Sequence, residues 1–402
     1  MTDDRELLKE PLATLRVGLV VSFLPIGINK SHLSVVAGFI ETIACAYANF
    51  SVMLLITNDN NKFIKQGTAK RRKKIYTANL KKLIIEFLGT KIAENITVKI
   101  VDGESSAPNV KSITLIDEYR PDILFFWGGI NNCRVLRRMA YKRYPVGFRF
   151  FNIKNLVDNN ADIYITSQID QQVRGPHDPT KCVYQPSVVK LYEDEHCYPF
   201  DHVKKSSDEF TITTVISGER LAEAVRGYTK ERVDSFFHVF NLHKNVRWVF
   251  IGPNTPDEVI VIDSRFSELI KQGRIEIINR EWHLRAFYRH CDLYVHLPDL
   301  VGGGGGVNMA RAEGIATLCY TGSDACAAQW PGAIYSDDSS FFSAVSYYIT
   351  NEPARDELGK TVREYMLANC SPEAVADKLK ENISRAIENY NLRVGITDKA
   401  SL

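Results

Sequence analysis

The sequence predicts an α/β protein built from two Rossmann-like, doubly wound domains that face a cleft. Three observations carry this prediction. Short apolar runs alternate with helical patterns, which is typical of parallel sheets with crossover helices. The alternation starts again after a polar passage at 193–210. The chain has 402 residues, which is more than one ordinary hydrophobic core accommodates.

The first series of apolar runs predicts the strands of an N-terminal domain. The expected strands are 15–23, 50–57, 96–102, 121–129, 144–152, 161–167 and 181–189. An apolar helix is expected at 33–48, directly after the first strand and its loop. This alternation of strand and helix predicts one doubly wound sheet. We therefore assign residues 1–200 to the first domain.

The second series predicts a C-terminal domain at 201–370. Its expected strands are 210–217, 246–252, 274–279, 292–298 and 315–320, and its expected helices are 229–243, 281–291 and 307–314. Residues 371–402 form the tail, in which 371–392 reads as an amphipathic helix. Ser371 and Pro372 suit the N-cap and the first position of that helix.

Charge is unevenly distributed along the chain. The net charge is +2, but residues 1–150 hold 23 Lys and Arg against 13 Asp and Glu, which leaves 27 against 35 in the remainder. The densest basic run is 65–83, which favours either a solvated helix face or a surface for an anionic membrane or an acidic acceptor. The sequence predicts no nucleic-acid partner.

Targeting signals and metal motifs are not evident in the sequence. The N-terminal 16 residues are polar and acidic, unlike a signal peptide. No apolar run reaches the roughly 20 residues that span a bilayer. Eight cysteines occur without a CxxC pair, which argues against a zinc site and a disulfide framework. We expect a cytoplasmic protein with no metal and no cofactor, with peripheral membrane contact as an option.

Five consecutive glycines at 302–306 lie between an expected strand and an expected helix. Glycine lets the backbone approach a ligand closely, and a helix N-terminus offers free N–H groups with a partial positive charge. In open α/β sheets, ligands bind beyond the carboxyl ends of the strands. The run therefore predicts a phosphate site, with a flexible hinge as the alternative.

A diphosphate also needs cations, and two follow the first strand of the second domain. Arg220 comes just after that strand, and Lys230 opens the next helix. Arginine provides a planar fork for phosphate oxygens, and lysine provides a point charge. Arg226 and Arg232 are rival candidates in the same stretch.

Several motifs in the second half together resemble the donor domain of the GT-B glycosyltransferases, in particular the large retaining family numbered four. They occur in the family's order: "SGERL", "TKERVDSFFHVF", "WVFIGP", "DLYVHLP", "GGGGGVNMARAEGIATLCY" and "TGSDA". In the first half, "LRVGLVVSFLPIGINKSH" is similar to the family's opening strand and glycine loop, and "RPDILFFWGG" to its later Pro-Asp strand. The resemblance covers nearly the whole chain.

The resemblance implies the GT-B fold, with the C-terminal helix packing back on the first domain. It implies metal-independent transfer of a hexose, with retention, from a nucleotide-diphosphate sugar to a glycan, glycoprotein or lipid-linked hydroxyl. GDP-mannose is favoured over UDP-glucose as the donor. The catalytic candidates are Arg220 and Lys230. The donor-binding candidates are Gly27, Gly218, Arg280, Gly304, Gly305, Gly306, Val307, Asn308, Met309 and Glu313. The acceptor-side candidates are Asn29, Lys30 and His32, of which His32 could equally be an ordinary helix-start residue.

The chain departs from the family pattern at two acidic positions. Counting back from Gly314, the family's glutamates fall at Val301 and Met309, and the nearest acids are Asp299 and Glu313. The family's first-domain histidine has no counterpart in "VGFRFFNIKN". These departures motivate one alternative, a GT-B-shaped sugar-nucleotide binding or interaction protein without turnover. A sugar-nucleotide epimerase of the same fold is a further alternative, which the lack of an evident carboxylate and histidine constellation disfavours. A nicotinamide dehydrogenase is disfavoured, because no GxGxxG opens the first strand-to-helix turn.

Overall fold

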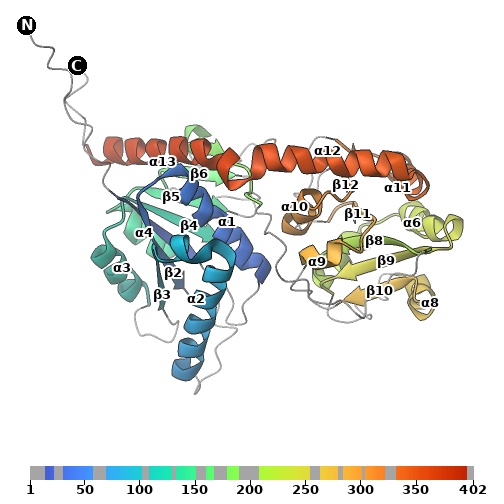
Figure 1. The fold of residues 1–402 in the computed structure, drawn as a ribbon, viewed down its shortest axis with the longest axis horizontal. Coiled ribbons are helices and arrows are strands. Elements are labelled where there is room, and N and C mark those ends of the chain that lie inside the picture. The colour runs from blue at the N-terminus through green and yellow to red at the C-terminus, as the bar shows by residue number, and fades with distance from the viewer. Residues whose placement is uncertain are drawn as a thin grey trace, which may run out of the picture. The chain divides into compact units, whose positions relative to one another are not determined.

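The computed structural model divides the chain into two units, each with its own parallel sheet (Figure 1). The first unit comprises Met1–Ser167, Gln171–Val188 and Pro372–Leu402, and the second comprises Gln168–Asp170 and Val189–Ser371. The structure describes residues 14–21, 30–57, 69–101, 108–128, 133–150, 160–166, 179–189, 208–253, 263–278, 284–300, 304–321 and 332–395.

The sheet of the first unit has the strand order β3-β2-β1-β4-β5-β6-β7, and all its described pairs are parallel. The strands are β1 (Leu15–Val21), β2 (Phe50–Thr57), β3 (Ile96–Val101), β4 (Ile123–Gly128), β5 (Val146–Phe150), β6 (Ile163–Thr166) and β7 (Cys182–Tyr184). Strands β1, β2, β4 and β6 are buried along most of their length because helices cover both faces.

Helices of the first unit divide between the two faces of its sheet (Figure 1). They are α1 (Lys30–Ala46), α2 (Ala69–Ala93), α3 (Pro108–Tyr119), α4 (Arg134–Tyr141) and α13 (Pro372–Val394), with a short 3-10 turn at Pro179–Lys181. Helices α1 and α13 share one core with Phe125 and Trp127, whereas α3 and α4 share the other with Phe126 and Phe148. The C-terminal helix thus packs on the N-terminal sheet through Leu379.

The sheet of the second unit has the strand order β10-β9-β8-β11-β12-β13, and its pairs are also parallel. Its strands are β8 (Phe210–Val215), β9 (Val246–Ile251), β10 (Ile275–Ile278), β11 (Leu293–His296), β12 (Thr317–Tyr320) and β13 (Ile334–Tyr335). Its helices are α5 (Gly218–Arg226), α6 (Lys230–Leu242), α8 (Arg265–Lys271), α9 (Leu284–Tyr288), α10 (Gly304–Ala312), α11 (Asp338–Thr350) and α12 (Glu352–Cys370).

An aromatic cluster fills one face of this second sheet. Trp248 is fully buried, and its ring packs against Phe236 with a centroid distance of 4.8 Å. Helices α6, α8 and α11 cover that face, while α9 and α10 cover the other. Such tightly packed faces hold the ends of the strands in fixed positions.

The predicted strands of both series are confirmed within a few residues. The helix expected at 371–392 is confirmed as α13, which begins at Pro372. Helix α10 begins at Gly304 instead of at 307. The elements that were not predicted individually are strand β13 and helices α2, α3, α4, α5, α8, α11 and α12. The polar passage expected as a linker lies mostly outside the described residues. The six described cysteines form no disulfide bond.

Candidate functional site

The strand order in the second sheet has a switch point between β8 and β11. The chain proceeds from β8 to β9 and β10 on one side, and then from β11 to β12 and β13 on the other. The connections that leave β8 and β11, which are neighbours, therefore diverge from one point. That switch point is where open α/β sheets bind ligands. The connection after β8 enters α5, and the connection after β11 enters α10.

The start of α10 is held tightly against the end of β8. A Cβ on Gly306 would lie 3.0 Å from Cβ of Val215 and 3.4 Å from the hydroxyl of Tyr288. The buried Tyr288 hydroxyl donates to the Gly306 carbonyl oxygen at 2.9 Å. Glycine is needed here for close packing of a helix on a strand. This packing explains why the helix already begins within the glycine run, where helix propensity is low.

Gly305 serves a different purpose from Gly306. A Cβ on Gly305 would meet nothing within 4 Å, and the residue is exposed in the first turn of α10. The first N–H groups of any α-helix have no partner inside the helix. The backbone of this turn therefore presents N–H donors without a side chain in front of them. The flexible-hinge alternative does not hold for Gly304–Gly306, which are helical.

Two side chains of the same turn point to different roles. Val307 is fully buried in the core beneath α10, so only its backbone remains for a ligand. Asn308 is 8% exposed, and its Oδ1 has no hydrogen-bond partner among the described residues. A buried amide oxygen without a partner costs free energy unless a ligand or water completes it.

Helix α5 presents a second N-terminus at the switch point. Its first residue, Gly218, is buried, and its N-cap residue Ser217 makes no hydrogen bond from its side chain to the helix. Gly252, at the end of β9, has φ +119°, and a Cβ there would lie 2.5 Å from the Ile216 carbonyl oxygen. The end of β9 thus fixes the connection that precedes α5, which gives the glycine of "WVFIGP" a structural reason.

Helix α6 begins beside the residues that lead into the glycine run. The Arg232 guanidinium bonds Asp299 at 2.6 Å and Asp338 at 2.9 Å. The hydroxyl of Tyr228, just before α6, donates to the carbonyl oxygen of Pro298. Arg232, a rival candidate in the sequence, is thus occupied by two carboxylates. Asp299, a nearby acid considered for a lost role, is its partner.

The predicted cations lie in the first turns of two helices. Arg220 is exposed in the first turn of α5, and Lys230 is exposed as the first residue of α6. Arg226 lies at the far end of α5. The structure therefore brings Arg220 to the switch point and Lys230 to the helix start that contacts the 297–300 loop.

The remaining donor candidates on α10 lie further along the helix. Met309 is partly buried and packs on the core that contains Tyr288. Glu313 follows the last turn of α10, about 13 Å from Gly304 along the axis at 1.5 Å per residue.

Some site candidates from the sequence are not covered by the structure. Gly27, Asn29, Arg280 and Val301 lie outside the described residues. Lys30 and His32 lie in the first turn of α1, and their side chains are outside the described part of the structure.

His296, at the end of β11, was not identified from the sequence. It is fully buried, its Nε2 lies 3.4 Å from the Leu300 carbonyl oxygen, and its Nδ1 has no partner among the described residues. Burial lowers the pKa of His296 to about 4, the Leu300 hydrogen bond opposes this shift, and the charge of Arg311 adds to it. The imidazole is therefore neutral at physiological pH, and its contact with Leu300 links the end of β11 to residues 297–300.

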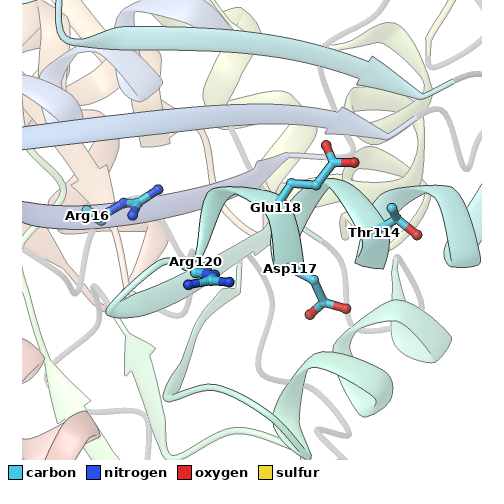
Figure 2. A pocket seen from close by; sticks show the side chains of 5 residues that line it. All are labelled: Arg16, Thr114, Asp117, Glu118 and Arg120. Atoms are coloured by element: carbon cyan, nitrogen blue, oxygen red, sulfur yellow. The ribbon is translucent and has the colours of Figure 1, made fainter.

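A surface pocket lies in the first unit, at the amino ends of the strands of its sheet (Figure 2). It is lined by Arg16, Thr114, Asp117, Glu118 and Arg120. Arg16 is near the start of β1, and Arg120 precedes β4, so this pocket is at the amino ends of the strands. Ligands of open parallel sheets bind at the other edge, so we do not assign the pocket to the site.

The described part of the chain offers neither a metal cluster nor a membrane-spanning helix. Its histidine, cysteine and carboxylate side chains form no group of three that could hold a metal ion. None of the helices among the described residues is both long and apolar enough to span a bilayer.

Among the comparisons with known proteins, only the comparison with solved structures found matches. No protein-family model matches the sequence, and no curated protein matches it. Sucrose-phosphate synthase from Thermosynechococcus elongatus matches with a TM-score of 0.62 and 10% identity, over 93% of this chain and 99% of that one. Anabaena Alr3699/HepE in complex with UDP-glucose matches with a TM-score of 0.56 and 11% identity, over 92% and 99%.

A third similar structure is an enzyme of another class. UDP-GlcNAc 2-epimerase from Neisseria meningitidis, bound to UDP-GlcNAc, matches with a TM-score of 0.53 and 9% identity, over 92% of this chain and 100% of that one. These similarities extend over both units, so the chain has the two-domain GT-B fold. The narrower resemblance to the retaining family four stays a prediction.

Proposed function

We propose that this chain is a glycosyltransferase that binds a nucleoside-diphosphate sugar at the carboxyl edge of its second sheet. The observation that carries the proposal is the pair of helix N-termini, of α5 and α10, at one switch point. The start of α5 has no side-chain cap, the start of α10 has no Cβ at Gly305, and Arg220 lies in the first turn of α5. Helix N-termini and arginine together are suited to a diphosphate.

The reaction that we propose is transfer of a hexose with retention of configuration. The acceptor oxygen forms a bond to the anomeric carbon while the bond from that carbon to the donor phosphate oxygen breaks. The acceptor's proton passes to the departing phosphate on the same face of the sugar. Arg220, Lys230 and the first amides of α10 stabilise the negative charge that grows on this phosphate. The reaction then needs no metal.

Two donors are the leading candidates in this proposal. The sequence favours GDP-mannose, through its family resemblance. The similar Anabaena protein is in complex with UDP-glucose, and the Neisseria epimerase is bound to UDP-GlcNAc, which supports testing uridine donors beside guanosine donors. Asn308, with its unpartnered Oδ1, is the donor-side group that we expect a sugar or ribose hydroxyl to reach.

The first unit binds the acceptor in this proposal. Its own switch point lies between β1 and β4, and the acceptor-side candidates Asn29, Lys30 and His32 are at the residues that follow β1. A glycan, a glycoprotein or a lipid-linked glycan fits the surplus of basic residues in this half. We also propose a cytoplasmic location, with peripheral contact to an anionic membrane through the basic run at 65–83.

A thermal-shift panel of nucleotides tests the donor site. GDP or UDP should raise the melting temperature, and Arg220→Ala should abolish that rise. Arg226→Ala is the matched control, because Arg226 is an exposed arginine at the other end of the same helix; it should leave the rise unchanged. No rise with any nucleotide would contradict the proposal.

Turnover separates the proposal from its two alternatives. The non-catalytic alternative is motivated by Val301 and Met309, which replace the acids of the family pattern. Incubation with a radiolabelled donor and a mixed acceptor panel should move the label to an acceptor. Label retained on an unchanged donor favours the binding protein, and conversion of the donor to its sugar epimer favours the epimerase.

A further inference from the structure

Arg149 lies at the carboxyl end of β5 in the first unit, with a guanidinium that is only partly satisfied. The residue is 5% exposed. Its Nη2 donates to Ser187 Oγ at 3.2 Å and, at 3.4 Å, to the Pro186 carbonyl oxygen. The guanidinium carbon lies 5.1 Å from the centre of the Trp127 ring on the neighbouring strand β4. Its Nη1 is buried and has no partner among the described residues.

This arginine keeps its charge without a counter-ion in the described part of the chain. Burial lowers the pKa of Arg149 to about 10, so the side chain is still positive at physiological pH. No carboxylate among the described residues forms an ion pair with it. A buried charge without a partner is costly. A cation retained in this setting points to an anion that completes it.

A second buried donor belongs to the segment that bonds Arg149. Gln185, two residues before Ser187, is fully buried, and its Oε1 accepts from Asn382 of α13 at 2.9 Å. Its Nε2 has no partner among the described residues. Helix α13 and Trp127 share one core, so Arg149 and Gln185 lie on the α1 and α13 face of the sheet. The two nitrogens without partners, Arg149 Nη1 and Gln185 Nε2, are both hydrogen-bond donors. A carboxylate or phosphate can accept hydrogen bonds from such donors.

Arg149 differs from Arg311 and Arg16 in its position relative to the sheet. Strand β5 adjoins β4, which forms the switch point with β1, so Arg149 lies one strand away from that switch point, where sheets of this kind bind ligands. Arg311, in the second unit, is also fully buried, and its Nε and Nη1 likewise have no partner among the described residues. It differs in place, because it lies on helix α10, with Cys319 Sγ 3.5 Å from its Nη2, and not at the carboxyl end of a strand. Arg16, in the pocket of Figure 2, is at the amino edge.

We propose that Arg149 and Gln185 form an anion subsite in the first unit, which binds a phosphate or carboxylate group of the acceptor. The assignment of this anion to the acceptor rests on the proposed function, whereas the subsite itself does not. The acceptor class that follows is an acidic sugar, that is, a sugar phosphate or a uronic acid. An Arg–anion pair with a buried amide donor would select such acceptors over neutral sugars.

Anion binding to the full-length chain tests this subsite without any donor. The probes are inorganic phosphate, glucose 6-phosphate, glucuronate and uncharged glucose, each added in a thermal-shift assay. We expect at least one charged probe to raise the melting temperature by about 2 to 4 °C at a hundredfold excess over its Kd. Glucose should give no rise. The phosphate and carboxylate arms identify which anion the subsite prefers.

Variants locate the response. Arg149→Met and Gln185→Leu should each lose the rise by the charged probe, and Arg149→Met without a probe should melt at the wild-type temperature or above it, because an unpaired charge is removed. Arg16→Gln and Arg311→Met should keep the rise. The subsite is excluded if no charged probe acts on the wild type, or if Arg149→Met and Gln185→Leu respond as the wild type does.

Nucleotides separate this inference from the proposed function. Arg149→Met should keep the melting-temperature rise that GDP or UDP produces, because that site belongs to the second unit. A wild type that responds to nucleotides but not to acidic sugars contradicts only the subsite. A wild type that responds to acidic sugars but to no nucleotide contradicts only the glycosyltransferase.

Discussion

The guanidinium of Arg232 lies 2.6 Å from Asp299 and joins the first turn of α6 to the residues before the glycine run. Asp299 has a positive φ of 57°, a conformation that aspartate tolerates better than most residues. Asp338 accepts from the Arg232 Nε at 2.9 Å, and the Tyr228 and Tyr320 rings lie 5.0 and 5.2 Å from the guanidinium carbon. Arg232 is thus a positioning residue for Asp299, which lies three residues before the glycine run.

Arg232→Met should therefore weaken nucleotide binding, although Arg232 is not proposed to contact the nucleotide itself. The Arg232 side chain is 14% exposed, whereas its partner Asp299 is 56% exposed, so we discount the ion pair for solvent and expect a loss of about 1 to 2 kcal/mol in unfolding free energy. Urea unfolding and nucleotide titration measure both effects. Arg226→Met, on an exposed position, should change stability by less than about 0.5 kcal/mol. Equal nucleotide affinity in Arg232→Met and wild type would contradict the positioning role.

Two neighbouring glycines should respond to alanine in opposite directions. Gly305→Ala places its Cβ in open space on a helix, so we expect about 0.5 to 1 kcal/mol of added stability. Gly306→Ala pushes its Cβ against Val215, so we expect a loss of about 1 to 3 kcal/mol. If Gly305 lies under a phosphate, its alanine variant should nonetheless bind GDP or UDP more weakly. Chemical denaturation and calorimetric titration of both variants check this. Stabilisation of both variants would contradict the observed packing.

Burial of neutral His296 should make the chain sensitive to acid. The pKa of His296 is about 4 in the folded chain and about 6.5 in an unfolded one. Between these values the unfolded chain binds more protons, so this contribution to stability is complete above pH 6.5 and is lost as the pH falls toward 4. At pH 5 the loss is roughly 2 kcal/mol relative to pH 7.5.

Urea unfolding of His296→Gln at both pH values measures this effect. The variant should be less stable at pH 7.5, and its stability should fall less between pH 7.5 and 5 than that of the wild type. His238→Gln, at an exposed position of α6, is the control and should follow the wild type at both values. A His296→Gln profile parallel to that of the wild type would contradict a buried, neutral histidine.

The fold could be predicted because its signal is local. Buried strands such as Val17–Val21 in β1 are continuous apolar runs, and a parallel sheet covered on both faces requires such runs. The start of α10 could not be predicted, since a glycine run has low helix propensity. The helix extends to Gly304 because Gly306 packs on Val215, which is 91 residues earlier in the chain.

The candidate site could be predicted only in part, because many of its contacts join residues that are distant along the chain. Arg220 and Lys230 could be selected because they follow a strand end in the sequence, where parallel sheets place their sites. Nothing in the sequence distinguished Arg232 from its rivals, because its partners Asp299 and Asp338 are distant along the chain. Arg149 was missed because its environment depends on residues 37 and 38 positions later.

Hydrogen exchange in the presence of a nucleoside diphosphate is the most direct test of the central claim. Peptides that cover 216–222 and 304–310 should exchange more slowly when GDP or UDP is bound, because the amides at the starts of α5 and α10 then have phosphate partners. The Arg220→Ala variant should lose this protection. Slower exchange confined to other segments, or unchanged exchange at both helix starts with nucleotide bound, would contradict a donor site at this switch point.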